Sequence, residues 1–388
     1  MIGACFGDEG KGLVTDSLCI GSGRTAVVRH NGGAQAGHTV EDGGRRFVFH
    51  QLGSGSFHGA DTVWADSFMP DLFKLSGELE EFTSLSGREP RVLAFPDTCP
   101  TLIDDVLINM ALESSRGSSR HGSCGMGINE ADNRISAGYG ITLGQMKGCT
   151  LGSLERRMRE IRSAYVPGRL KKLGLEPDRL GEYGEMLSDP EVIGRAALNM
   201  MRGLEKVSII EGKEPLSGYS RIVFEGAQGL LLDSMNKEFA PHVTASRTGL
   251  DMPLRSCEKI GAKLGTAVYV IRSYVTRHGA GPLPGECGKS LLGDIGDDLT
   301  NQPNPWQGTI RYAPHQAAES LLKAVKKDLD REHRPAAWLA VTHLNETGNM
   351  VRSVAGDMSF EELCADSRFS GVFERVVPFY SGRSERLV

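Results

Sequence analysis

The chain has 388 residues, 39% of them hydrophobic and 24% charged, which is typical of a globular protein and unlike a disordered or fibrous one. Its formal net charge of −5 gives no basic field to hold a nucleic-acid backbone, so we expect no nucleic-acid partner. The eight cysteines contain no Cys-x-x-Cys pair, which disfavours a zinc cage or a thioredoxin-type redox centre.

The start of the sequence leads from Met1 directly into a glycine-rich loop. It lacks the basic and apolar regions of a secretory leader, and no apolar run reaches membrane-spanning length. Scattered cysteines without a leader are typical of reduced thiols in a cytosol. We therefore expect a soluble, cytoplasmic protein with no membrane partner.

Short apolar runs separated by glycine-rich segments predict buried strands along the whole chain. In chain order they cover residues 25–28, 91–94, 221–224, 267–271 and 337–341. Three of these runs lead into loops that are dense in polar residues, namely residues 225–229, 272–281 and 342–346. This pattern predicts an α/β fold with a central, mostly parallel sheet, helices on both faces, and a site at the strand ends.

Helical periodicity is clearest over residues 154–165 and 315–331. The polar segment 167–189, punctuated by Pro and Gly, predicts a surface excursion. No internal repeat or linker divides the chain, and the candidate loops extend from residue 7 to residue 386. We therefore expect one large domain covering residues 1–388.

The first candidate site is the loop Gly7-Asp8-Glu9-Gly10-Lys11-Gly12, which lies between a short apolar start and a predicted helix. Glycines let backbone N–H groups approach a phosphate, and a helix N-terminus favours negative charge. The loop is not a standard P-loop, because Cys5 stands where the first glycine belongs and Gly12 replaces the magnesium-binding Ser or Thr. Alone, it fits a phosphate cradle and a charged surface turn equally well.

Two further loops add candidate chemistry. The segment 29–39 surrounds His38 with small residues, and a histidine near neutral pKa can donate a proton to a developing oxyanion. The segment 121–127 contains Ser123 and Cys124 among glycines, which suits either a second phosphate cradle or a flexible turn.

Taken together and in order, these motifs resemble those of the adenylosuccinate synthetase family. That family carries GDEGKG, NAGHT, TTGxG, EGAQG, TTRxGxGPxPTE, TKLD and STG motifs. The matching segments here are residues 7–12, 35–39, 123–127, 225–229, 275–286, 342–345 and 380–382. The resemblance covers nearly the whole chain and implies the P-loop-NTPase-like fold of that family.

The resemblance also implies a mechanism. Asp8 would take the N1 proton of a 6-oxopurine nucleotide and bind Mg²⁺, which the backbone carbonyl of Gly37 would help to hold. His38 would stabilise the phosphoryl group that moves to O6, with Lys11 supplying positive charge. The amine of aspartate would then displace phosphate from C6. Catalysis is thus assigned to Asp8, His38 and Lys11.

The resemblance distributes the remaining contacts over three subsites. Those for the donor nucleotide are Gly7, Glu9, Gly10, Lys11, Gly12, Leu13, Gly37, His38, Thr39, Asn345, Ser381 and Gly382. Those for the purine substrate are Asp8, Gln35, Ala36, Ser123, Cys124, Arg134, Gln228 and Thr244. Aspartate would bind Gly308, Thr309 and Arg311. Arg311 suits its carboxylate, because a guanidinium pairs with a carboxylate through two hydrogen bonds. Arg134 would reach across the interface of a homodimer, the assembly that the family implies.

Several departures from the family concern the substrates. Asn345 replaces the aspartate that suits guanine, and an amide both donates and accepts, as adenine requires, so we expect ATP or dATP rather than GTP as donor. Gln35 and Cys124 replace an asparagine and a threonine, and Arg247 lies in an altered segment, 239–250. These changes resemble the phage branch that joins aspartate to dGMP and makes N6-succino-2-amino-2'-deoxyadenylate for diaminopurine DNA.

Alternatives remain open at this level. Many members of the phage branch carry serine in place of the loop aspartate, whereas Asp8 is retained here, which favours the ordinary reaction of IMP, aspartate and GTP. A phage-encoded protein would work in the host cytoplasm. A non-catalytic nucleotide-binding regulator would be expected to lose Asp8, Lys11 or His38, and all three are present. An unrelated P-loop GTPase or kinase is disfavoured by the failed spacing of the first loop.

Overall fold

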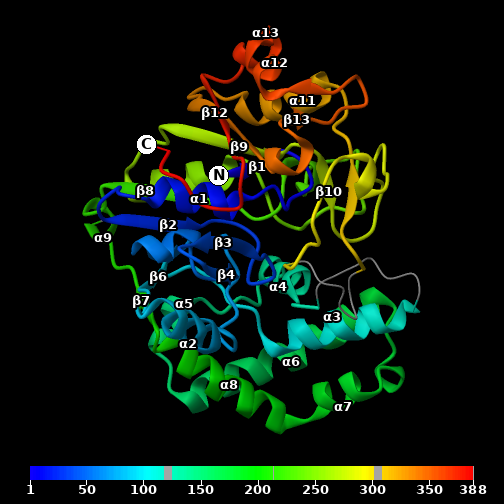
Figure 1. Cartoon of the computed structure of the whole chain (residues 1–388). Coiled ribbons are helices and arrows are strands. Elements are labelled where there is room, and N and C mark those ends of the chain that lie inside the picture. Colours follow the sequence, from blue (N-terminus) through cyan, green and yellow to red (C-terminus); the bar gives the residue numbers. More distant parts are fainter. Residues whose placement is uncertain (118–124, 213, 301–307, 388) are drawn as a thin grey trace.

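The computed structural model describes residues 1–117, 125–212, 214–300 and 308–387. Its framework is a pair of parallel sheets with the strand orders β7-β6-β5-β2-β8 and β1-β9-β12-β15 (Figure 1). The strands of the first sheet are β2 (Thr25–Arg29), β5 (Asp61–Trp64), β6 (Val92–Ala94), β7 (Val207–Ile209) and β8 (Arg221–Glu225). Those of the second are β1 (Ile2–Gly3), β9 (Thr266–Arg272), β12 (Ala336–Thr342) and β15 (Arg375–Pro378).

Backbone contacts join the two sheets where β1 meets the segment that follows β8. Gly3 forms a parallel bridge with Gly229, and the amide of Gly226 donates to the carbonyl of Met1 at 3.1 Å. The sheets therefore continue into one another. The segment 225–229 is held against the strand that leads into the 7–12 loop.

Helices cover both faces of this sheet, and the alternation of side chains along β2 shows how. Val27 packs with Leu13 and Val14 of α1 (Lys11–Cys19) on one face. Ala26 and Val28 pack on the other face, in the cluster that contains Cys257 of α10 (Asp251–Ile260). The strand is buried at every position, as its continuous apolar run predicts.

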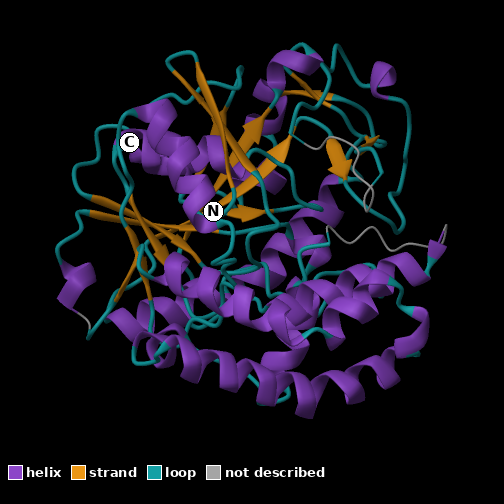
Figure 2. Cartoon of the chain, turned by 90° about the horizontal axis from the view of Figure 1, so that it is seen from below, coloured by secondary structure: helices purple, strands orange, loops and turns teal. Residues whose placement is uncertain are grey.

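A helical layer, drawn at the bottom of Figure 1 and seen from below in Figure 2, is inserted between β6 and β7. Its helices are α3 (Ile103–Ser115), α4 (Ile128–Ser136), α5 (Leu143–Lys147), α6 (Leu151–Leu173), α7 (Glu182–Ser188) and α8 (Pro190–Leu204). The remaining helices are α2 (Leu75–Ser86), α9 (Glu214–Ser217), α11 (Ala318–Leu329), α12 (Phe360–Ala365) and α13 (Ser367–Ser370). Short antiparallel pairs complete the fold: β3 (His38–Asp42) with β4 (Arg45–Phe49), β10 (Val275–Arg277) with β11 (Arg311–Ala313), and β13 (Met350–Val351) with β14 (Met358–Ser359).

The strands expected from the sequence are all present, each within one residue of its expected ends. The segment 167–189 is mostly exposed, as expected of a surface excursion, but it is helical, because α6 continues through Pro167 and α7 follows it. Leu170, Leu175 and Leu187 of this segment are buried in a hydrophobic cluster with α3. These leucines attach the surface segment to α3. Within the described ranges, no helix is both long and apolar enough to cross a membrane.

Candidate active site

The loop before α1 is held in shape by its own backbone and by one arginine. Gly10 adopts the left-handed conformation (φ 87°) directly before α1 begins, which glycine tolerates without strain. Asp8 is also left-handed (φ 58°). The Nε of Arg272, at the end of β9, donates to the carbonyl oxygen of Asp8. Strand β9 therefore fixes how the loop presents the Asp8 side chain.

Glu9 organises the inside of this loop. Its carboxylate accepts hydrogen bonds from the amides of Cys5 and Gly7 at 3.1 and 2.8 Å. It also lies 2.6 Å from the ammonium group of Lys11, and both side chains are almost fully buried. A buried charge is tolerated only where it is paired and hydrogen bonded, as both are here. The pair therefore holds Lys11 in place at the start of α1.

His38 forms the second fixed group. Its Nδ1 lies 2.7 Å from Oε1 of Glu225, at the end of β8, and both side chains are buried. Glu225 also accepts from the amide and hydroxyl of Ser54 and lies near Arg29. Burial alone would raise the pKa of Glu225, but His38, Arg29 and Ser54 lower it to about 2. Glu225 is thus a carboxylate that fixes the tilt of the imidazole.

The close approach of α1 to His38 explains one unusual residue of the loop. A Cβ at position 12 would lie 2.9 Å from the Cβ of His38 and 3.2 Å from the hydroxyl of Ser54. Only glycine fits without displacing the imidazole. The serine or threonine of a standard P-loop is therefore sterically excluded at Gly12.

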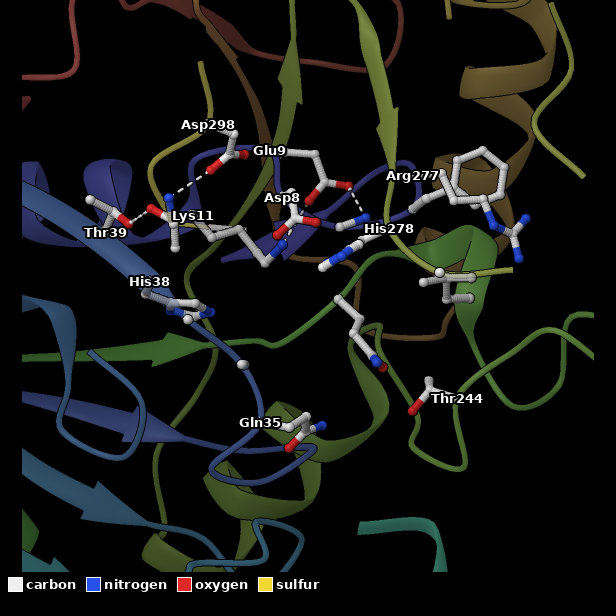
Figure 3. Close-up of a pocket in the computed structure, with 18 of the residues that line it drawn as sticks. Asp8, Glu9, Lys11, Gln35, His38, Thr39, Thr244, Arg277, His278 and Asp298 are labelled. Carbon is white, nitrogen blue, oxygen red and sulfur yellow. Dashed lines mark hydrogen bonds and ion pairs between the residues drawn. The ribbon is translucent and has the colours of Figure 1, made fainter. Parts of the chain in front are cut away.

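These groups face one cavity of about 660 Å³. Figure 3 shows Asp8, Lys11 and His38 gathered on one side of it and Thr244 on the loop across from them. The walls come from segments that follow β2, β8, β9 and β12, so the cavity lies at the carboxyl ends of parallel strands. That is where open α/β sheets bind ligands.

The electrostatics of the cavity suit proton and phosphoryl transfer. Burial raises the pKa of Asp8 above its ordinary value, although Arg272, Lys11 and His278 oppose the shift. A raised pKa makes a carboxylate a stronger base. Burial lowers the pKa of His38, although the carboxylate of Glu225 beside it opposes the shift.

Oxygen ligands for a magnesium ion are also in place. Within the described residues no side chain hydrogen bonds to the carboxylate of Asp8, and Gly37 lies on the same cavity wall. Mg²⁺ typically takes one or two protein oxygens and completes its shell with phosphates and water. The oxygen atoms of Asp8 and Gly37 are therefore of the kind that Mg²⁺ takes. No cluster of three or more His, Cys, Asp or Glu ligands occurs in the ranges that the structure covers.

Comparison with known proteins agrees with this arrangement. The family model described as adenylosuccinate synthetase matches residues 1–310. The chain belongs to the adenylosuccinate synthetase family. The adenylosuccinate synthetase of Synechococcus sp. is 32% identical over 314 residues, which span 78% of this chain and 66% of that protein. That of a Neisseria meningitidis strain is 30% identical over 78% of this chain and 67% of its own length. The matched part thus spans about two thirds of these relatives.

Two solved structures share the fold. Fully ligated adenylosuccinate synthetase from Plasmodium falciparum superposes with a TM-score of 0.66 and 20% identity, covering 89% of this chain and 76% of its own. The cyanophage S-2L succinoaminodeoxyadenylate synthetase, bound to dGMP and dATP, gives a TM-score of 0.61 and 13% identity, covering 99% of this chain and 92% of its own. At these identities the likeness concerns the fold.

Most residues that the family motifs assign do line the cavity. They are Gly7, Asp8, Glu9, Gly10, Lys11, Gly12, Leu13, Gln35, Ala36, Gly37, His38, Thr39, Gln228, Thr244 and Gly382. Ser123 and Cys124 lie outside the described residues. Ser381 is next to Gly382, and its hydroxyl accepts from the amide of Arg383. The structure describes Gly308 and Thr309, and neither is among the described residues that line the cavity.

The structure does not bring Arg134 to the cavity, although the resemblance assigns it to the purine substrate across a dimer interface. Its guanidinium is fully buried within its own chain, where it pairs with Asp105 through Nε and Nη2 at 2.9 Å each. It also donates to the carbonyls of Tyr139 and Pro100. These contacts occupy its donors, so Arg134 fixes α4 against α3.

Arg311 and Asn345 also lie differently from expectation. Arg311 is paired with Glu286 at 2.7 Å and donates to the carbonyls of Gly279 and Gly281, so a carboxylate ligand would have to displace Glu286. Asn345 is exposed and absent from the described cavity wall, where His343 and Glu346 lie instead. The motif match thus places the segment 342–346 at the cavity, with His343 and Glu346 on its wall.

Several cavity residues carry no assignment from the motifs. Arg272 also donates to the hydroxyl of Tyr274, which donates in turn to Glu346. Thr300 hydrogen bonds to Thr39 at 2.5 Å and brings the segment 295–300 against the β3–β4 pair. The position of Arg272 directly after a predicted strand was a usable signal, since strand ends carry the site. For Thr300, the sequence offers none.

Proposed function

We propose that this protein joins aspartate to C6 of a 6-oxopurine nucleotide through a 6-phosphoryl intermediate, as a carbon–nitrogen ligase. The observation that carries the proposal is the meeting of Asp8, Lys11 and the His38–Glu225 pair at one cavity. A nucleotide-binding regulator has no need of a buried carboxylate that fixes the tilt of a histidine.

The groups suit the two steps in turn. Asp8 removes the N1 proton, so electrons move toward O6, which attacks the γ-phosphorus of the donor while the nucleoside diphosphate leaves. His38 hydrogen bonds to the transferred phosphoryl group, and Lys11 offsets its negative charge. A Mg²⁺ ion held by Asp8 and Gly37 would supply further charge neutralisation. The amine of aspartate then forms the C6–N bond as phosphate departs.

The substrate we propose first is dGMP, with ATP or dATP as donor. The departure at Gln35, on the cavity wall, favours dGMP, and the change at Asn345, in the segment whose His343 and Glu346 line the cavity, favours an adenine donor. The cyanophage enzyme that is bound to dGMP and dATP superposes on 99% of this chain, so the two proteins share their fold over nearly all of it. The product would be N6-succino-2-amino-2'-deoxyadenylate.

The second candidate is the reaction of IMP, aspartate and GTP. The presence of Asp8 at the cavity favours it, as do the curated relatives, which are named adenylosuccinate synthetases. For either substrate we propose a homodimer, which sedimentation velocity would test.

The test is phosphate release with each of dGMP, GMP and IMP, combined with each of ATP, dATP and GTP, in the presence of aspartate and Mg²⁺. We expect a succinylated product from dGMP with ATP or dATP, identified by mass. Exclusive use of IMP with GTP would replace the first proposal by the second.

A matched variant separates catalysis from binding. Asp8→Asn keeps the size of the side chain but removes the base, so turnover should fall by about 10²–10⁴-fold while the nucleotides still bind. Unchanged turnover in Asp8→Asn would show that the base is misassigned. Absence of turnover in the parent protein with every combination would favour the regulator.

A further inference from the structure

The wall of the cavity opposite Asp8 is a long loop between β8 and α10. Its residues Val243, Thr244 and Ala245 line the cavity, and Figure 3 shows Thr244 on this loop. The loop has little regular structure beyond a short 3-10 turn, Leu230–Leu232. Something other than a helix or strand must therefore hold Thr244 in place.

Asp233 is the centre of the contacts that close this loop. Its carboxylate accepts from the amides of Thr248 and Met235 at 2.7 and 2.9 Å. Beside it, the amide of Thr244 donates to the carbonyl of Leu232 at 2.8 Å, and the amide of Ser234 to the carbonyl of Ser246 at 3.1 Å. The two arms of the loop are thereby tied together just behind Thr244.

Arg247 connects this centre to the rest of the fold. Its Nε lies 3.0 Å from Asp233, and its Nη2 lies 2.5 Å from Asp251 in the first turn of α10. Asp251 is also paired with Arg331 at 2.6 Å, and Arg331 with Asp328 of α11 at 3.2 Å. A chain of alternating charges thus runs from the cavity wall to α10 and α11.

The same chain of contacts ends on the central sheet. Asp328 accepts from the hydroxyl of Tyr269 on β9 at 2.8 Å and from the amide of Leu250 at 3.0 Å. Strand β9 also carries Arg272, which orients Asp8. Strand β9 therefore contacts both sides of the cavity, through Arg272 on the side of Asp8 and through Tyr269 and Asp328 on the side of Thr244.

We infer that Arg247 is a positioning residue for the purine-nucleotide subsite, acting through Asp233 on the loop that carries Thr244. Arg247 does not line the cavity, and its side chain is 40% exposed, so it acts on the nucleotide only through that loop. This inference rests on the proposed function in one respect, the assignment of Thr244 to the purine nucleotide. We expect the loss of Arg247 to change nucleotide affinity rather than turnover, because Asp8, Lys11 and His38 are held by other contacts.

The experiment compares Arg247→Ala with Arg159→Ala. Arg159 is a matched control, since its guanidinium also pairs with an acidic residue four positions away, Glu155, and its side chain is 42% exposed. We expect Arg247→Ala to weaken purine monophosphate binding, measured by calorimetry, about 5- to 20-fold. Donor nucleotide binding and kcat should change less than twofold. Arg247→Lys should recover part of the loss, and Arg159→Ala should match the parent protein.

Two outcomes would overturn the inference. One is equal weakening of monophosphate and donor binding in Arg247→Ala, which would indicate a general loss of structure. The other is full additivity with Thr244→Ala, because a residue that acts through Thr244 adds little once that hydroxyl is gone. Binding of the monophosphates is measured without turnover, so failure of the proposed ligase reaction would show separately, as bound nucleotide without product.

Discussion

The loop at residues 7–12 and the wall at residues 229–248 build opposite sides of the same cavity by different means. The first is held by a buried ion pair two residues apart, by its own backbone and by Arg272 of β9. The second is tied together by Asp233 and connected to α10 and α11 by a partly exposed chain of ion pairs. A buried pair tolerates no loss of a partner, whereas a half-exposed chain can lose one link and keep the fold. The two regions should therefore respond to mutation in different ways.

The largest effect is expected where the loop depends on Glu9. Glu9→Gln leaves Lys11 charged and buried without its partner, which costs about 3–5 kcal/mol in a buried pair. We expect the urea midpoint of unfolding to fall accordingly, with loss of turnover. The double change Glu9→Gln with Lys11→Met should recover much of the stability but no activity. Recovery of neither would mean that the amide contacts of Glu9, rather than its charge, hold the loop.

A change at Glu225 tests how His38 is held on the same side of the cavity. Glu225→Gln keeps the shape but removes the charge that orients His38, and partners of this kind typically contribute about 10- to 100-fold. We expect kcat to fall by that factor while nucleotide affinity stays within twofold, measured by steady-state kinetics. A change confined to KM would contradict the role given to Glu225.

On the opposite wall, Asp233→Ala should have a smaller effect on stability. It leaves the amides of Thr248 and Met235 without an acceptor, at about 1–3 kcal/mol for a buried group, partly offset by water at this half-open edge. We expect a lower thermal midpoint and weaker monophosphate binding, with kcat retained. If Asp233→Ala destabilises the protein as much as Glu9→Gln, the contrast between the two regions fails.

The same contrast explains what the sequence could predict. The charged residues inside the 7–12 loop stand next to one another, so a contiguous motif predicted the loop and the chemistry we propose for it, but not the contact from Arg272. Strand positions also followed from short apolar runs. The ion-pair chain from Asp233 to Asp328 joins residues far apart in sequence, and charged residues at such spacing carry no periodic signal. Nothing in the sequence marks Arg134 as buried against Asp105 either.

The smallest effect is expected at Asp16 of α1, which is fully buried. Its carboxylate lies 3.1 Å from Nε2 of His58. The hydrogen bond to Asp16 raises the pKa of His58, despite partial burial. A group whose pKa is raised on folding adds stability that is complete below its unfolded pKa, about 6.5, and is lost as pH rises through the folded value. We therefore expect the protein to lose part of its stability between pH 6 and pH 8.5, by less than about 1 kcal/mol, because the His58 side chain is partly exposed.

Urea unfolding at both pH values checks this, with His58→Gln beside His333→Gln, a change at an exposed histidine. The pH dependence should shrink in His58→Gln and remain in His333→Gln. His58→Gln removes the charged partner of Asp16 at the lower pH, so the informative quantity is the difference between the two pH values rather than either one. An unchanged difference in His58→Gln would mean that the pair contributes geometry to α1 but no pH-dependent stability.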